Sequence, residues 1–186
     1  MPIPSPFHER MHPLCTSYRW KEWAGYYAVS SYDICHEREY NAFRQGAGML
    51  DVSPLFKYDF QGPEASECLS RIMARGLTKL GVGRVVYACW TDDVGKIIDD
   101  GTVARLDDEH YRVTSASPCM HWFLTHAQGF NVVVTDTSAQ IAALAIQGPT
   151  SRDALRQITD IDMDSLRFFG AASSEAVVEE VMDYRT

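Results

Sequence analysis

The sequence lacks any apolar run that approaches the roughly 20 residues needed for a membrane-spanning helix, so no membrane partner is expected. Residues 1–6 have neither the basic nor the apolar segment of a signal peptide, and their prolines predict an extended arm. The motifs of P-loop nucleotide sites (GxxxxGKS/T), serine hydrolases (GxSxG) and zinc proteases (HExxH) are also absent. A composition of 46% hydrophobic and 23% charged residues then predicts a soluble globular protein.

Basic residues are scarce relative to acidic ones, with 17 Lys and Arg against 25 Asp and Glu. The formal net charge of -8 repels phosphate backbones, so no nucleic-acid partner is expected. The cysteines are odd in number and widely spaced without a CxxC pair, which predicts neither a zinc site nor a redox dithiol. Scattered histidines likewise indicate no metal. Reduced thiols favour a cytoplasmic localisation.

The first third of the chain combines an aromatic stretch with helical and strand signals. Residues 1–30 are aromatic and irregular, and they predict an N-terminal arm that packs over a core or a cleft. Asp33 as a cap and Gly46 as a stop favour a helix over 33–45. Alternation predicts a strand over 55–60, followed by a helix that starts near Pro63.

A β-rich block occupies the middle of the chain. Strands are predicted over 84–90, 96–106 and 111–116, joined by acidic turns at 92–95 and 107–109. Such short connections predict an antiparallel meander, and the mixture with helices favours an α+β fold. The later predicted elements are a helix over 117–129, strands over 130–134 and 142–146, and a helix that ends near residue 157.

A short internal repeat suggests how the chain divides. Residues 59–64 and 145–150 both have the pattern strand, Gln-Gly-Pro, helix. We therefore predict an N-terminal arm at 1–30, a first α+β unit at 31–138 and the start of a second unit at 139–186. Because the chain stops directly after a possible strand at 176–182, the second unit is expected to be incomplete and the chain to be a fragment or one piece of a larger assembly.

Two adjacent acids, Asp99 and Asp100, interrupt the predicted strand 96–106. Acids are poor strand residues, and neighbours along a strand point to opposite faces, so the two cannot share one role. Gly101 permits a bulge or the close approach of a ligand. A carboxylate in a cleft accepts a proton or stabilises a developing cation. The alternative, which residue type alone favours, is that both acids cap a bend and are solvated.

Several segments occur in the order and with the spacing of a known family. They are GAGMLDVS at 46–53, GRVVY at 83–87, DVGKIIDD at 93–100, YRVTSA at 111–116, AIQGP at 145–149 and FFG at 168–170. Together they resemble the N-terminal half of the glycine-cleavage T-protein (aminomethyltransferase) family and its folate-binding relatives. The resemblance covers about residues 20–170, and the combination of segments is specific to that superfamily.

The resemblance implies a truncated ferredoxin-like, folate-binding T-protein fold, with an antiparallel sheet, flanking helices and a central tetrahydrofolate channel. It assigns Asp99 as the catalytic carboxylate, which favours attack by the folate nitrogen on an activated one-carbon unit, and Asp100 as its structural neighbour. Cofactor-binding positions carried over from the family are Leu55, Tyr87, Asp99, Tyr111 and Val113. The implied partner is folate together with a lipoylated carrier protein or a small methylated donor.

The sequence also departs from the family pattern. Pro54-Leu55 replaces a His-Met pair, and Gly95-Lys96 replaces a Gly-Gly pair. The chain ends before the GYTGE segment that completes the site, so a C-terminal segment or a second chain is expected to complete it. Two alternatives stay open: a folate-dependent O-, S- or N-demethylase of methoxy-aromatics, dimethylsulfoniopropionate or sarcosine and dimethylglycine, and a non-catalytic folate-binding module.

Overall fold

The computed structural model describes residues 1–174, so the possible strand at 176–182 lies outside the described residues. The elements, in chain order, are α1 (His8–Met11), η1 (His12–Leu14), β1 (Arg19–Trp23), β2 (Tyr26–Ser31), α2 (His36–Gln45), β3 (Gly48–Asp51), β4 (Phe56–Gln61), α3 (Ala65–Ile72), β5 (Arg84–Thr91), β6 (Ile97–Asp107), β7 (His110–Ser115), α4 (Met120–His126), β8 (Val133–Asp136), η2 (Ser138–Gln140), β9 (Leu144–Gln147) and α5 (Ser151–Arg156). This mixture of antiparallel sheets and flanking helices confirms the α+β class.

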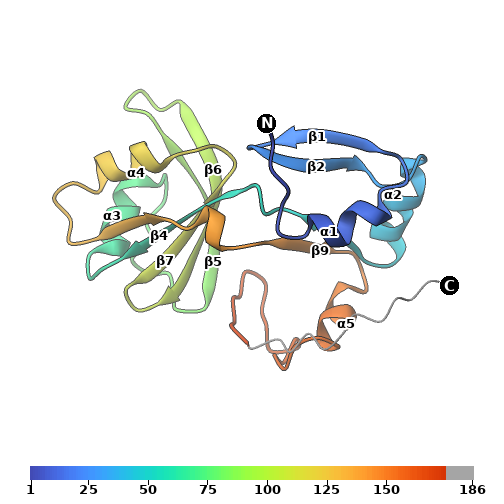
Figure 1. The fold of residues 1–186 in the computed structure, drawn as a ribbon. Helices are drawn as coiled ribbons and strands as arrows, with labels where there is room; N and C mark the ends of the chain where they lie inside the picture. The colour runs from blue at the N-terminus through green and yellow to red at the C-terminus, as the bar shows by residue number, and fades with distance from the viewer. Residues whose placement is uncertain (175–186) are drawn as a thin grey trace.

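The largest layer is a five-stranded antiparallel sheet in the order β5-β6-β7-β4-β8. Figure 1 shows α3 and α4 on one side of this sheet and the β1–β2 hairpin, α1 and α2 on the other. The predicted meander over 84–116 is confirmed as β5, β6 and β7, with ends that differ from the prediction by at most one residue. No helix in residues 1–174 is both long and apolar enough to cross a membrane.

The core lies between the sheet and its two helices. Residues alternate along β4, so Tyr58 and Phe60 are buried beneath the helices, whereas Lys57 and Asp59 point to the opposite face. Phe123 of α4 meets both aromatic rings edge-on, at centroid distances of 5.1 and 5.4 Å. Burial of these large rings gives the helix layer its main stabilising contact with the sheet.

The prediction of an irregular N-terminal arm was wrong for its second half, which forms the β1–β2 hairpin. Trp23 pairs with Tyr26 across the two-residue turn Ala24-Gly25, where both residues have positive φ angles of 47° and 84°. That backbone suits a tight hairpin, and cross-strand aromatic pairs stabilise one. The extended start is also tied down, because Ile3 forms a parallel bridge with Tyr26.

Both copies of the predicted repeat form a strand, a Gly-Pro turn and a helix. β4 leads through Gly62-Pro63 into α3, and β9 leads through Gly148-Pro149 into α5. The two glycines have positive φ angles of 146° and 124°, and an added Cβ would lie 2.3 Å from a backbone oxygen in each case. Both turns therefore require glycine for the same reason.

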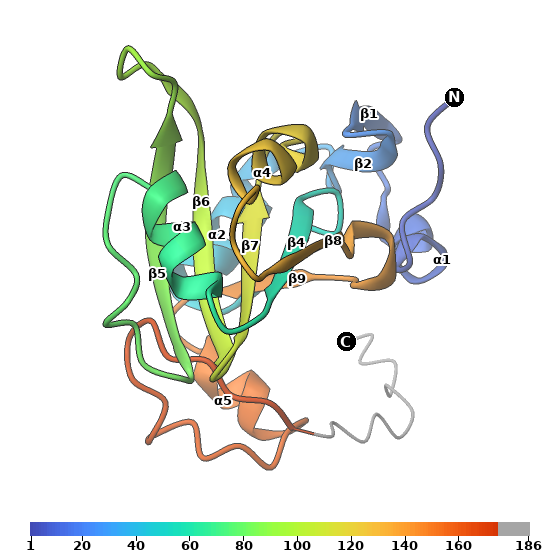
Figure 2. The same cartoon turned by 90° about the vertical axis from the view of Figure 1, so that its left-hand side faces the viewer.

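β9 pairs antiparallel with β3, a strand that was not predicted. The segment after residue 139 is thus hydrogen-bonded to the segment that precedes β4. Figure 2 shows β9 passing behind the five-stranded sheet, on the side away from α3 and α4. The proposed division at 1–30, 31–138 and 139–186 stays a prediction, and the β3–β9 pairing crosses its boundary at residue 139.

Candidate functional site

The two adjacent acids of β6 point to opposite faces of the sheet, as predicted. Asp99 lies opposite Trp90 on the helix-covered face and is 8% exposed. Asp100 lies opposite Cys89 and is exposed on the other face. The alternation of the strand therefore gives the two carboxylates different surroundings and excludes a shared role.

Backbone N–H groups fix the Asp99 carboxylate. One oxygen accepts the N–H of Asp100 at 2.8 Å, and the other accepts the N–H of Ser117 at 2.8 Å, in the segment that leads into α4. The neighbouring Ser115 hydroxyl donates to the carbonyl of Ser117 at 2.9 Å. The carboxylate is thus held between β6 and the start of the α4 segment, at the rim of the core.

Gly101 was expected to allow a bulge or the approach of a ligand, and the structure shows a different reason for it. It lies opposite Ser115 in the β6–β7 ladder, where an added Cβ would be 1.8 Å from the carbonyl oxygen of Thr114. The close approach is therefore that of the neighbouring strand. Gly101 therefore allows β6 and β7 to pair closely, two residues from Asp99.

Tyr87 and Asp100 form a polar pair on the other face of the sheet. The Tyr87 ring is 53% exposed, and its hydroxyl donates to a carboxylate oxygen of Asp100 at 2.5 Å. This hydrogen bond, together with partial burial, raises the pKa of the Tyr87 phenol. The pair offers an accessible aromatic ring next to a hydrogen-bond acceptor, which is chemistry suited to a flat heterocycle with N–H donors.

The remaining positions that the family resemblance assigns to folate binding lie in β7 and just before β4. Tyr111 and Val113 of β7 are 1% and 0% exposed and belong to the core beneath α3 and α4. Leu55 is half-buried just before β4, where its N–H donates to the carbonyl of Val52 at 3.1 Å. In this structure the side chains of the two β7 residues pack in the core and are closed to solvent. Their assignment as folate contacts stays a prediction.

A charged cluster that was not predicted from the sequence lies on the face opposite the core. Arg112 donates two hydrogen bonds to the Asp59 carboxylate, at 2.7 and 2.8 Å, and the His110 ring nitrogen lies 3.0 Å from the same group. Burial raises the pKa of Asp59, but the hydrogen bonds from Arg112 and His110 outweigh it and leave that pKa below its ordinary value. The signal was available, because charges alternate with aromatic rings along β4.

A second buried charge lies beside this cluster. Lys57 is 3% exposed, and its Nζ donates to the carbonyl of Ser53 at 2.7 Å. Burial lowers the pKa of this ammonium, and the nearby Asp51 carboxylate partly offsets the effect. Lys57 therefore ties β4 to the Asp51-Val52-Ser53 segment, one of the segments that carried the family resemblance.

Comparisons with known proteins identify the family and support the fold. The model of the GCVT N-terminal domain family matches residues 11–186. An aminomethyltransferase of Staphylococcus epidermidis (strain RP62A) is 30% identical over 137 residues, which is 72% of this chain. The crystal structure of glycine cleavage system aminomethyltransferase T from Bartonella henselae superposes with a TM-score of 0.78 over 91% of this chain, at 22% sequence identity.

All of these matches belong to one fold class, the T-protein-like α+β proteins. The chain belongs to the GCVT N-terminal domain family. It covers 38% of the length of the S. epidermidis relative and 47% of the B. henselae chain. The chain therefore spans less than half the length of both relatives.

Proposed function

We propose that this chain forms the N-terminal part of a tetrahydrofolate-dependent one-carbon transferase of the glycine-cleavage T-protein type. Family membership and the names of the relatives support the proposal. The observation that carries it is the Asp99 carboxylate, which two backbone N–H groups hold in place at the rim of the core. A carboxylate fixed in this way needs no reorganisation when positive charge develops nearby.

Asp99 is the proposed reacting-centre residue. Tetrahydrofolate, when bound, supplies the nucleophilic nitrogen that accepts the one-carbon unit. A carboxylate next to that nitrogen stabilises the positive charge that develops there and accepts its proton. Asp99 is suited to this role because each oxygen uses one backbone donor and keeps further acceptor capacity.

The residues of the described chain fit part of a folate molecule. The exposed ring of Tyr87 offers a stacking surface, and its hydroxyl is fixed by the hydrogen bond that it donates to Asp100. Leu55 adds a half-buried apolar side chain. Because Tyr87 and Asp99 lie on opposite faces of the sheet, these residues make up only part of a site, and we propose that a further segment or a second chain completes it.

The proposed donor is a carrier protein or a small methylated molecule. A lipoylated carrier protein that bears an aminomethyl group is the donor expected for the T-protein type, and a cytoplasmic location fits that chemistry. The replacement of the family His-Met pair by Pro54-Leu55 favours a demethylase that acts on a small methylated donor as the second candidate.

The test compares Asp99→Asn with Asp100→Asn in the full gene product. The two acids are adjacent, and both replacements are isosteric, so each variant serves as the control of the other. Purified protein is incubated with tetrahydrofolate and either an aminomethylated lipoyl protein or methylated amines, and 5,10-methylene- and 5-methyltetrahydrofolate are quantified. Turnover should fall by about 100-fold or more for Asp99→Asn and change little for Asp100→Asn. Folate binding without turnover by any donor would indicate the non-catalytic module.

A further inference from the structure

A cavity of about 570 Å³ lies at one end of the five-stranded sheet, where β6 and β7 meet the segment 171–173. This volume falls within the range of small-molecule sites, which is about 300–1,000 Å³. Figure 2 shows the chain after α5 passing the lower end of β5, where the Ala171 N–H donates to the carbonyl of Gly83 at 2.8 Å. Arg105, on the cavity wall, is six residues from Asp99 along β6, so about 20 Å separate their backbones. The cavity is therefore separate from the proposed reacting centre.

Among the described residues, the charged side chains on the cavity wall are two arginines, and Arg105 is the more tightly held. It donates to the carbonyl of Leu80 at 2.8 Å and to two carbonyls at the β6–β7 turn. Its guanidinium also lies over the Tyr111 ring, 5.4 Å from the centroid. A guanidinium has five N–H donors, so two of them keep the capacity to bind a ligand. Arg105 is thus fixed in place without being saturated.

Arg112 is the second cation of the wall. Its Nε and one Nη2 hydrogen bind the Asp59 carboxylate, and its Nη1 forms no hydrogen bond within residues 1–174. Asp59 compensates the charge of Arg112, but Arg105 has a weaker partner. The Asp108 carboxylate lies 3.7 Å from Arg105 and its side chain is 87% exposed, so solvent screens that pair. The cavity therefore keeps a positive character and free N–H donors.

Apolar side chains form much of the remaining wall. Val82 and Leu106 line the cavity and are 50% and 36% exposed, and Ala171 and Ala172 close the side opposite the sheet. Leu106 lies in the irregular step of the β6–β7 ladder, between the partners of Tyr111 and His110. Such bulges turn a side chain away from the regular alternation of the strand. Apolar groups therefore lie beside the two guanidinium groups.

The geometry points to a binding site for a small organic anion, with a carboxylate or phosphate group on Arg105 and Arg112 and an apolar body on Val82 and Leu106. Planar guanidinium groups bind both kinds of oxyanion with paired hydrogen bonds. An apolar body gains from the burial of Val82 and Leu106, which water now contacts. Binding at this site requires neither Asp99 nor a one-carbon donor, so it is independent of the proposed transferase activity.

Calorimetric titration of the full gene product with phenyl phosphate, benzoate and phenol tests this site. The three probes share an aromatic body, and phenyl phosphate and benzoate carry the negative charge. At least one of these two anions should bind saturably and about tenfold more tightly than phenol, which corresponds to about 1.4 kcal/mol. Its affinity should fall as sodium chloride is added, because salt screens the attraction. The anion that binds more tightly identifies the head group, phosphate or carboxylate, that the two arginines prefer.

Variants locate the binding. Val82→Glu places a carboxylate at the cavity, and Val82→Gln is its uncharged match at the same half-exposed position. Val82→Glu should weaken anion binding about tenfold, and Val82→Gln by less than about twofold, because only the first repels the ligand. Arg105→Gln should also weaken it about tenfold, through loss of a charged donor. Circular dichroism confirms that each variant is folded. Saturable binding of neither anion, affinity no greater than that for phenol, or equal affinity in Val82→Glu and Val82→Gln would overturn the proposal.

Discussion

At the scale of single residues, the strand alternation of β6 separates two carboxylates that the sequence places side by side. Asp99 is buried at the rim of the core and bonded to two backbone N–H groups, whereas Asp100 is exposed and accepts the Tyr87 hydroxyl. The opposite orientation was predictable from the period of a β-strand. The two backbone hydrogen bonds to Asp99 were not predictable in this way, because the β6–β7 pairing brings Ser117 to Asp99.

Tyr87→Ala should weaken tetrahydrofolate binding by roughly three- to tenfold, because loss of a stacking ring costs about 0.5–1.5 kcal/mol. The ring is 53% exposed, so its removal leaves the core intact. Calorimetry measures the change. Tyr87→Phe keeps the ring and serves as the control; if it weakened binding as much as Tyr87→Ala, the hydroxyl and not the ring would be responsible.

Asp59→Asn should destabilise the protein by about 1–3 kcal/mol at pH 7, because Arg112 then loses its charged partner. The pKa of Asp59 lies below its ordinary value of 3.8 in the folded protein, so its contribution is present above that pH and is lost as the pH falls further. The difference in the free energy of unfolding between variant and wild type, measured with urea, should therefore shrink as the pH falls below 3.8. A difference independent of pH would contradict this assignment.

At the scale of secondary-structure elements, local signals predicted the strands and turns well. The meander β5–β7 and the two strand–Gly-Pro–helix turns follow from alternation and turn residues within short windows. The pairing of β3 with β9 joins residues far apart in the sequence, and its short strands carry no strong alternation, so it was missed. The β1–β2 hairpin was missed because its tight turn, Ala24-Gly25, carries none of the usual Asn-Gly or Asp-Gly signals.

Gly101→Ala should destabilise the five-stranded sheet by about 1–3 kcal/mol, as expected for forced overpacking. The new Cβ would lie 1.8 Å from the Thr114 carbonyl oxygen, so β6 and β7 would have to separate. Gly76→Ala is the matched control, because nothing lies within 4 Å of an added Cβ there. Urea unfolding compares the two; equal stability would show that the strands adjust without cost.

At the scale of the whole molecule, the residues carried over from the family divide between two faces of one sheet. Tyr87 lies on the open face, Asp99 at the rim of the other face, and Tyr111 and Val113 within the core. Sequence resemblance predicted the family and the fold, but a residue-by-residue transfer does not distinguish side chains that line a site from those that support it. Tyr87 and Asp99 therefore make up only part of a site, and we propose that a further segment or a second chain completes it.

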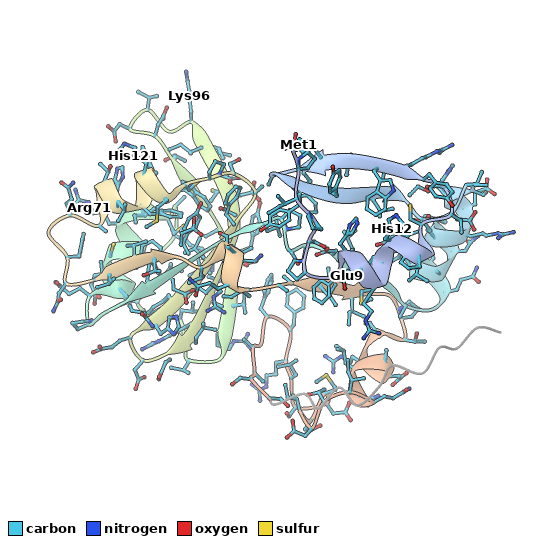
Figure 3. All side chains as sticks on the ribbon, viewed as in Figure 1. Met1, Glu9, His12, Arg71, Lys96 and His121 are labelled. Carbon is cyan, nitrogen blue, oxygen red and sulfur yellow. The ribbon has the colours of Figure 1, made fainter. Side chains whose placement is uncertain are left out.

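The hairpin between β5 and β6 extends from the body of the molecule, with Lys96 at its tip pointing away (Figure 3). Val94 and Ile97 beside it are 77% and 68% exposed. Replacing these two apolar side chains by polar ones, in the variant Val94→Ser with Ile97→Thr, should leave the free energy of unfolding within about 0.5 kcal/mol of wild type. Exposed side chains contribute little to folding. A loss of several kcal/mol in urea unfolding would show that the tip packs against another part of the protein.

Calorimetric titration of the full gene product with tetrahydrofolate, alongside the purified 186-residue chain, tests the central claim most directly. For the full gene product the proposed function predicts saturable binding in the micromolar range, a binding free energy of about 8 kcal/mol in magnitude, and a weaker interaction for Tyr87→Ala. A folded chain that takes up no tetrahydrofolate, alone or joined to the rest of the gene product, would contradict the assignment of this family member as a folate-dependent transferase.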